Sequence, residues 1–228
     1  SDRYDPSEPP STYDDGAASI VKVPFRFNLL NRVRPLRGLS GILEEARPDV
    51  VFVHNIMADL PDIVAYVRRQ PGCRLILDYH ADYSNSGRNW LSLKVLHGII
   101  RKRFLDRARP YITKIFPIVP SGAIFLHEVY QVPYAEMEVL PLGADTDMAR
   151  QVRASNAGTT IRGNLGIPPE TLCIFTGGKL TEAKRTHLLI EALELLPDLP
   201  LHLLVVGSAP PGAEGYERRL VELAARTN

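Results

Sequence analysis

The sequence has few of the features that mark specialised classes of protein. Its only two cysteines, Cys73 and Cys173, lie a hundred residues apart without a CxxC or histidine-rich spacing, so neither a disulfide framework nor a zinc site is expected. Lysine plus arginine (27) and aspartate plus glutamate (26) nearly cancel, which argues against nucleic acid as a partner. The chain has no run of about 18 apolar residues that could span a membrane. These absences favour a globular protein of the reducing cytoplasm.

The first nineteen residues, "SDRYDPSEPPSTYDDGAAS", are acidic and rich in proline. A signal peptide would be basic and then apolar, so this segment is not one. We expect residues 1–19 to form a flexible segment. The absence of an initiator methionine predicts that the chain begins partway into a longer protein.

Residues 20–147 alternate between short aliphatic runs and longer amphipathic segments. Runs without polar breaks are typical of parallel strands that are covered on both faces. The predicted strands are 49–54, 74–79, 113–119 and 137–140. The predicted helices are 37–47, 60–69, 92–107 and 121–130. Strand–helix alternation of this kind predicts a doubly wound, Rossmann-like α/β domain.

A second strand–helix series follows after residue 160. Residues 148–160 lose apolar periodicity and are predicted to be a linker. In residues 161–228 the predicted elements are strands at 171–177 and 201–207 and helices at 183–196 and 214–226. Because two strands leave a sheet edge and much apolar surface uncovered, we expect this to be the first part of an incomplete second domain.

The second series contains a glycine turn followed by cations at the start of a helix, in "TLCIFTGGKLTEAKRTHLLIEALELL". Cations in the first turn of a helix are disfavoured by roughly 0.3–1 kcal/mol each. Strand, glycine turn and helix N-terminus together form a common phosphate-binding arrangement. We therefore expect Gly178, Lys179 and Lys184 to hold a diphosphate. The alternative is that the glycines only make a turn and that the lysines are solvated.

The helix of this series carries apolar residues that fall on one face and should pack it on a sheet. These residues are Leu188, Leu189, Ala192, Leu195 and Leu196.

Several motifs occur in a fixed order along the chain: "PDVVFVHN", "LDYH", "PSGAIFLHEVYQVP", "MEVLPLGADTD", "FTGGKLTEAKRTHLLIEAL" and "LHLLVVGSA". In this order they resemble the retaining glycosyltransferases of the GT-B type, in particular glycosyltransferase family 4. The resemblance covers roughly residues 45 to 225. It implies two Rossmann-like domains facing a cleft, with the second, C-terminal domain holding a nucleotide-sugar donor and the first, N-terminal domain on the acceptor side.

The resemblance also assigns roles to individual residues. Lys179 and Lys184 fall where the family contacts the donor diphosphate. His80 falls on the family's histidine near the transferred sugar and is the candidate catalytic residue. The alternative is that His80 is a structural residue at a strand end, with its hydrogen bonds already made within the protein. Asp82 and Ser84, which follow it, are candidates for contact with the acceptor.

Two positions depart from the family's pattern. Ala209 replaces a glycine, which puts close approach to the nucleotide in doubt, and Leu142 replaces the usual asparagine before Gly143. A late motif of paired glutamates that contacts the sugar is absent.

Residues 145–147, Asp-Thr-Asp, spell the DxD signature with which other glycosyltransferases bind a divalent cation. The family's "GVDtd" turn already accounts for this stretch, and neither HExxH nor another ligand spacing is present. No metal and no cofactor are therefore expected.

The segment 94–109 carries six lysines or arginines and one aspartate. Its apolar side could pack on the sheet while its charge is solvated or meets a phosphorylated acceptor, or the segment could make peripheral contact with an anionic membrane.

Together these features predict a glycosyltransferase, EC class 2.4, that moves a hexosyl or related sugar with retention and without metal. Its acceptor would be a glycan, a lipid or a small molecule. The alternative is a non-catalytic nucleotide- or glycan-binding module derived from such an enzyme.

Overall fold

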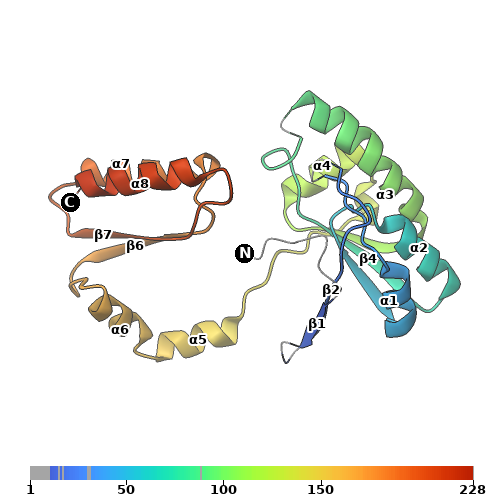
Figure 1. Ribbon diagram of the computed structural model, residues 1–228, viewed down its shortest axis with the longest axis horizontal. Coiled ribbons are helices and arrows are strands. Elements are labelled where there is room, and N and C mark those ends of the chain that lie inside the picture. The colour runs from blue at the N-terminus through green and yellow to red at the C-terminus, as the bar shows by residue number, and fades with distance from the viewer. Residues whose placement is uncertain (1–10, 15, 17, 30–31, 88, 228) are drawn as a thin grey trace. The chain divides into compact units, whose positions relative to one another are not determined.

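The computed structural model describes residues 11–227, apart from positions 15, 17, 30, 31 and 88. The chain divides into two compact units, Ser1–Gly143 and Ala144–Asn228, whose elements are labelled in Figure 1. The division lies a few residues before the boundary expected from the sequence, between 147 and 148.

The first unit begins with a β-hairpin. Strand β1 (Ser11–Asp14) pairs antiparallel with β2 (Ser19–Lys22). Residues 11–14 and Ser19 of the segment predicted to be flexible, 1–19, thus lie in paired strands; residues 1–10 lie outside the described part of the chain. The side chain of Asp14 accepts a hydrogen bond from the backbone N–H of Gly16, which has a φ of 86°. A left-handed glycine next to an aspartate is turn chemistry, which the overall acidic and proline-rich composition hid.

The central sheet of the first unit contains three parallel strands in the order β3-β4-β5. They are β3 (Val50–His54), β4 (Arg74–Tyr79) and β5 (Ile112–Pro117), and they confirm three of the predicted strands. The fourth, 137–140, is not a strand but a single bridge from Met137 to Ile115. The backbone N–H groups of Glu138 and Leu140 donate to β5, but Pro117 has no N–H to donate back, so a full ladder does not form.

Helices connect these strands, as the alternating pattern predicts. They are α1 (Leu39–Ala46), α2 (Leu60–Arg69), the π-helix η1 (Leu91–Arg101), α3 (Lys102–Ala108), the 3₁₀ turn η2 (Arg109–Tyr111), α4 (Pro120–Tyr130) and the 3₁₀ turn η3 (Tyr134–Glu136). Prolines stand in the first turns of α2 and α4, where a missing N–H costs nothing. Within the described residues, none of the helices is long and apolar enough to cross a membrane.

The core of the first unit forms between the sheet and these helices. Alternate residues of β4, namely Leu75, Leu77 and Tyr79, are at most 1% exposed. They pack with Phe125 and Tyr130 of α4. This core fixes the carboxyl end of β4, where His80 follows.

The second unit contains two parallel strands and five helical segments in the described part of the chain. They are α5 (Thr146–Ala154), α6 (Ala157–Asn164), β6 (Leu172–Gly177), the 3₁₀ turn η4 (Glu182–Lys184), α7 (Thr186–Glu194), β7 (Leu201–Val206) and α8 (Glu214–Thr227). The segment predicted to be a linker, 148–160, is mostly helical. The side chain of Asp145 accepts from the N–H of Met148 at 2.8 Å and caps α5, a local signal that the low apolar content of the segment obscured.

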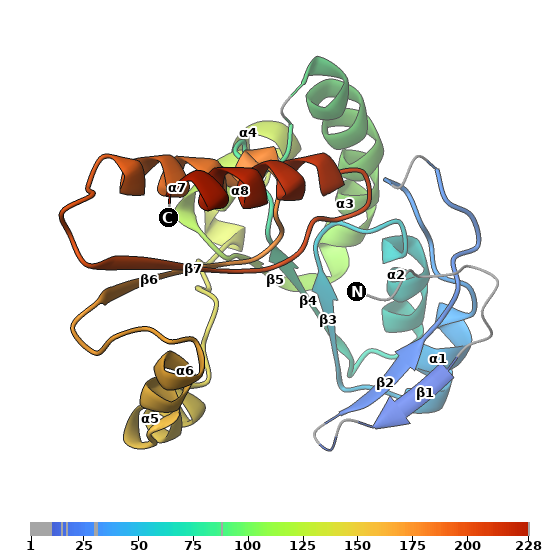
Figure 2. The ribbon, with the colours of Figure 1, turned by 60° about the vertical axis from the view of Figure 1, so that its left-hand side comes forward.

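Helices α7 and α8 cover one face of the β6–β7 pair, as both views show (Figures 1 and 2). Ile190 of α7 packs with Tyr216 and Leu220 of α8. The packing face predicted for α7 is wrong, since Leu188 is 46% exposed and Leu195 is 80% exposed. Because α7 packs against α8 as well as the sheet, the buried side passes through Thr186 and Ile190 instead.

Candidate functional site

A cavity of about 440 Å³ lies in the first unit, at the carboxyl end of β4. His80, the predicted catalytic residue, lines it. Other residues that line the cavity are Arg32, Asn55, Asn85, His97 and Arg101. Carboxyl ends of parallel strands are the usual place for ligands in α/β sheets.

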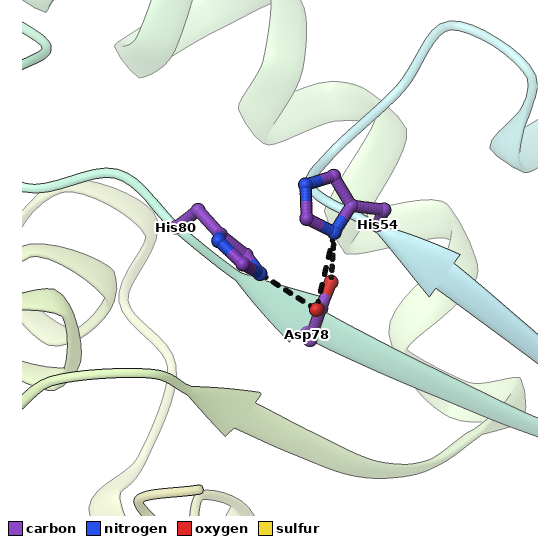
Figure 3. A group of neighbouring side chains, drawn as sticks. All are labelled: His54, Asp78 and His80. Atoms are coloured by element: carbon purple, nitrogen blue, oxygen red, sulfur yellow. Dashed lines mark hydrogen bonds and ion pairs between the residues drawn. The ribbon is translucent and has the colours of Figure 1, made fainter. Parts of the chain in front are cut away.

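The side chain of His80 is held by a buried carboxylate (Figure 3). Nε2 of His80 lies 2.7 Å from Oδ2 of Asp78, and Nδ1 of His54 lies 3.1 Å from the same oxygen. The two imidazole rings tilt toward each other with centroids 4.0 Å apart. Asp78, which is 8% exposed, therefore sets the orientation of both rings.

Two asparagines hold the backbone of His80. The N–H of His80 donates to Oδ1 of Asn55 at 2.9 Å, and Nδ2 of Asn85 donates to the carbonyl of His80 at 3.0 Å. Asn55 has a φ of 66°, a left-handed conformation that asparagine tolerates better than most residues, and its N–H donates to the carbonyl of Asp78. The position of His80 is thus fixed on both its side chain and its backbone.

Asp82 and Ser84, the predicted acceptor contacts, lie in the loop after His80 but do not line the cavity. The carboxylate of Asp82 accepts from Ser121 Oγ at 2.7 Å and from Ser84 Oγ at 2.6 Å. Hydrogen bonds from Ser121 and then Ser84 hold the pKa of Asp82 below its usual value. These bonds tie the loop to the start of α4, and the neighbouring Asn85 and Ser86 line the cavity instead. Contact with the acceptor stays a prediction for both residues.

The sequence reasoning missed His97, a buried residue of the cavity wall, and its partner Tyr130. Nδ1 of His97 lies 2.6 Å from the hydroxyl of Tyr130, and both side chains are at most 1% exposed. Burial, followed by the charges of Arg101 and Arg32, lowers the pKa of His97 to about 4. Burial raises the pKa of Tyr130 to about 12. A neutral imidazole has one donor and one acceptor nitrogen, and a phenol can donate or accept, so this bond forms without a charge on the ring.

The glycine turn of the second unit follows β6, as predicted. Gly178 has a φ of 129°, and a Cβ at Gly207 would lie 1.9 Å from the carbonyl oxygen of Gly178. The turn therefore requires glycine at both positions. Lys179 and Lys184 are exposed, and the ammonium group of neither makes a hydrogen bond or an ion pair with a described residue. The structure thus leaves both ammonium groups available to an anion.

Two groups of side chains bear on the question of a metal. Ligand atoms of His54, Asp78 and His80 all lie within 4.8 Å of one another, a set of donors that suits a transition metal. The carboxylate already joins the two rings by hydrogen bonds. Of the DxD pair, Asp145 caps α5 and Asp147 pairs with Arg150 in the same helix, so these carboxylates act within the helix.

Residues 2–148 match the family model described as Glycosyltransferase Family 4. The chain belongs to glycosyltransferase family 4. A search of curated proteins found no significant match.

Several solved structures resemble this family 4 chain in fold. A glycosyltransferase from Rickettsia africae superimposes with a TM-score of 0.58 at 16% identity, covering 83% of this chain and 46% of its own. Anabaena Alr3699/HepE in complex with UDP-glucose superimposes with a TM-score of 0.60 at 17% identity, covering 90% of this chain and 52% of its own. The E. coli trehalose-6-phosphate structure bound with UDP-2-fluoro glucose superimposes with a TM-score of 0.62 at 13% identity, covering 100% of this chain and 62% of its own.

These structural relatives are GT-B glycosyltransferases, and the fold of the family 4 chain is of that type. The chain spans about half the length of the structures that it matches.

Proposed function

We propose that this protein transfers a sugar from a nucleoside diphosphate sugar to an acceptor, with retention and without a metal ion. Membership of family 4 supports this proposal, and so do the related folds solved with UDP-glucose and UDP-2-fluoro glucose. The observation that carries it is the turn after β6, which requires glycine and is followed by two lysines whose ammonium groups have no partner among the described residues.

In this proposal the turn holds the donor diphosphate. Gly178 presents bare backbone, so phosphate oxygens can approach closely, as they do at other strand–turn–helix sites. Lys179 and Lys184 provide two positive charges, which stabilise the negative charge that develops on the leaving diphosphate. This stabilisation replaces the divalent cation that DxD enzymes use, since Asp145 and Asp147 act within α5.

His80 acts on the acceptor side in this proposal. Its Nε2 bonds to Asp78, which directs the rest of the ring toward the cavity that His80 lines. An imidazole held in this way can hydrogen-bond a sugar hydroxyl and keep one orientation through the reaction. Asp78 is the positioning residue, because it bonds the ring of His80.

The donor site is tested by changing Lys179 and Lys184 to alanine in the full-length protein. Binding of a nucleoside diphosphate should weaken at least tenfold, whereas binding of the nucleoside alone should change less than twofold, because only the phosphates lose partners. Arg226→Ala in α8 removes one exposed positive charge of the same unit and serves as the control. Calorimetric titration with UDP, GDP and ADP, and with the nucleosides uridine, guanosine and adenosine, gives both affinities and identifies the base. Equal losses for nucleoside and diphosphate would count against the proposal.

A non-catalytic binding module is the second candidate, and one observation favours it. The N–H of Ala209, which stands where the family has a glycine near the nucleotide, donates to Oε2 of Glu217 at 2.7 Å. This amide is therefore engaged and does not face a ligand as it is. Full-length protein that binds a nucleotide sugar but releases no diphosphate over a panel of glycan, lipid and small-molecule acceptors would establish the second candidate. Product with the donor's anomeric configuration, seen by NMR, would establish the first.

A further inference from the structure

Two cavities of the first unit are neighbours and share part of their lining. The cavity beside His80, called here the polar cavity, shares Arg32, Asn89 and Ser92 with a second hollow of about 310 Å³. The second hollow is called here the apolar groove, because most of its lining is aliphatic. Its aliphatic residues are Leu29, Val33, Leu91, Val95, Leu96 and Ile100.

The polar cavity has the charge of an anion site. Arg32 and Arg101 bring two guanidinium groups, and among the described residues no aspartate or glutamate lines it. Asn85, Asn89 and Ser92 add neutral hydrogen-bonding groups. The positive field is strong enough that both arginines contribute to lowering the pKa of His97. Paired arginines without a neighbouring carboxylate suit a phosphate or diphosphate.

Exposed hydrophobic residues lie in and beside the lining of the apolar groove. It lies between η1 and the segment around Leu29 and Val33. Leu29 is 53% exposed, and Trp90 and Leu91 at the start of η1 are 71% and 63% exposed. Large apolar side chains gathered at one exposed edge mark a binding surface more often than scattered ones do. The π-helical winding of η1 is itself a geometry that is frequent at functional sites.

We propose that the two hollows together bind one amphiphile, with a phosphate or diphosphate headgroup in the polar cavity and a prenyl or acyl chain in the apolar groove. The shared residues Arg32, Asn89 and Ser92 mark the point where headgroup and chain join. If the protein transfers a sugar as proposed above, this amphiphile is the acceptor. The acceptor role therefore rests on the proposed function, whereas binding of the amphiphile does not. The headgroup then lies beside His80, so a sugar attached there is held at the same cavity.

Tryptophan fluorescence can report binding at this site without any sugar donor, because Trp90 is the only tryptophan of the chain. Its sequence neighbours Asn89 and Leu91 both line the groove. Titration with decyl phosphate below its micelle concentration should shift the tryptophan emission to shorter wavelength in a saturable way. Decyl maltoside, with the same chain and no charge, should bind at least tenfold more weakly. Inorganic phosphate should leave the emission unchanged at the same concentrations.

Chain length separates an amphiphile site from a site for free anions. From hexyl to decyl phosphate the affinity should rise by up to about fourfold for each methylene group buried in the groove. Affinity that is independent of chain length would overturn the proposal, because it would assign the polar cavity to a free phosphate.

Variants locate the headgroup. Arg32→Gln and Arg101→Gln should each weaken decyl phosphate binding about tenfold, whereas Arg103→Gln, an exposed arginine of α3 outside both linings, should change it less than twofold. Arg32 is exposed, so its variant keeps the fold, which circular dichroism checks. Equal binding by Arg32→Gln and Arg103→Gln, or decyl maltoside bound as tightly as decyl phosphate, would overturn the proposal.

The amphiphile site and the proposed function can fail separately. Decyl phosphate that binds as described to a full-length protein without transferase activity supports the site and refutes the acceptor role. Sugar transfer to soluble glycans by a protein that does not bind decyl phosphate supports the proposed function and refutes the site.

Discussion

Acidification should destabilise the first unit through His97. Its side chain is 1% exposed and faces Tyr130 and Phe125 of α4, Arg101 of its own helix, and Arg32. None of these groups is a carboxylate that could pair with an imidazolium, and the two arginines repel it. The perturbation is therefore a fall in pH, compared between the natural protein and His97→Asn, whose amide oxygen can still accept from Tyr130.

The magnitude follows from the pKa of His97, which falls from an ordinary value of 6.5 to about 4 in the folded protein. Between these values the unfolded chain binds more protons than the folded one, so stability rises with pH through this window and levels off above 6.5. A difference of about 2.5 pH units corresponds to at most about 3 kcal/mol. Lowering the pH from 7.5 to 4.5 should cost the natural protein about 2–3 kcal/mol through this group.

Urea denaturation followed by Trp90 fluorescence measures this cost, because Trp90 lies next to η1. Asp59, whose pKa is raised by burial, and Asp82, whose pKa is lowered by hydrogen bonds, also titrate in acid. The quantity to compare is therefore the difference between variant and natural protein at each pH. The free energy of unfolding of His97→Asn should depend much less on pH than that of the natural protein. His127→Asn on α4 is the control and should keep the natural pH dependence. Parallel stability curves for all three proteins would refute this explanation.

Three further predictions concern the turn, the histidine and the metal. Gly207→Ala should destabilise the second unit by about 1–3 kcal/mol and weaken diphosphate binding, because the new Cβ would lie 1.9 Å from the carbonyl oxygen of Gly178. Thermal melts measure the change in stability. The control is Gly215→Ala in α8, whose nearest neighbour is 4.0 Å away and which should be neutral or stabilising. His80→Ala should lower the turnover of the full-length enzyme while leaving the Kd for the nucleoside diphosphate within about twofold, and unchanged turnover would make His80 structural. Transfer should survive excess EDTA, and its abolition with rescue by manganese would restore the DxD interpretation.

The sequence predicts the parallel strands well because their runs are unbroken. β3, β4, β6 and β7 all begin and end within a residue of the predicted ranges, since an aliphatic run in this setting has few other stable conformations. Helices α5 and α6 were not predicted, because neither contains a buried residue and both are poor in large apolar side chains. The buried side of α7 was predicted wrongly, since it depends on α8 as a neighbour, which no local pattern of α7 encodes.

Sequence motifs predicted only those residues of the candidate site that lie within a short contiguous stretch of the chain. The glycine turn and His80 belong to short contiguous stretches, so their places at strand ends could be inferred. Asp78 and His54 are 24 residues apart, and His97 and Tyr130 are 33 apart. Pairs at such separations are set by sheet register and helix packing, not by spacing in the chain. Only the fold reveals that Asp78 holds two imidazole rings.

Hydrogen-bond partners separate structural polar residues from those available to a ligand. The carboxylate of Asp82 accepts from Ser121 and Ser84, so its loss should first loosen the loop after β4. Lys179 and Lys184 have no such partner among the described residues, so their loss should leave the fold intact and remove only ligand contacts. His80 combines both conditions, because Asp78 holds one side of its ring while the residue lines the polar cavity. Loss of function without loss of stability is therefore expected at the two lysines, and loss of both at Asp82.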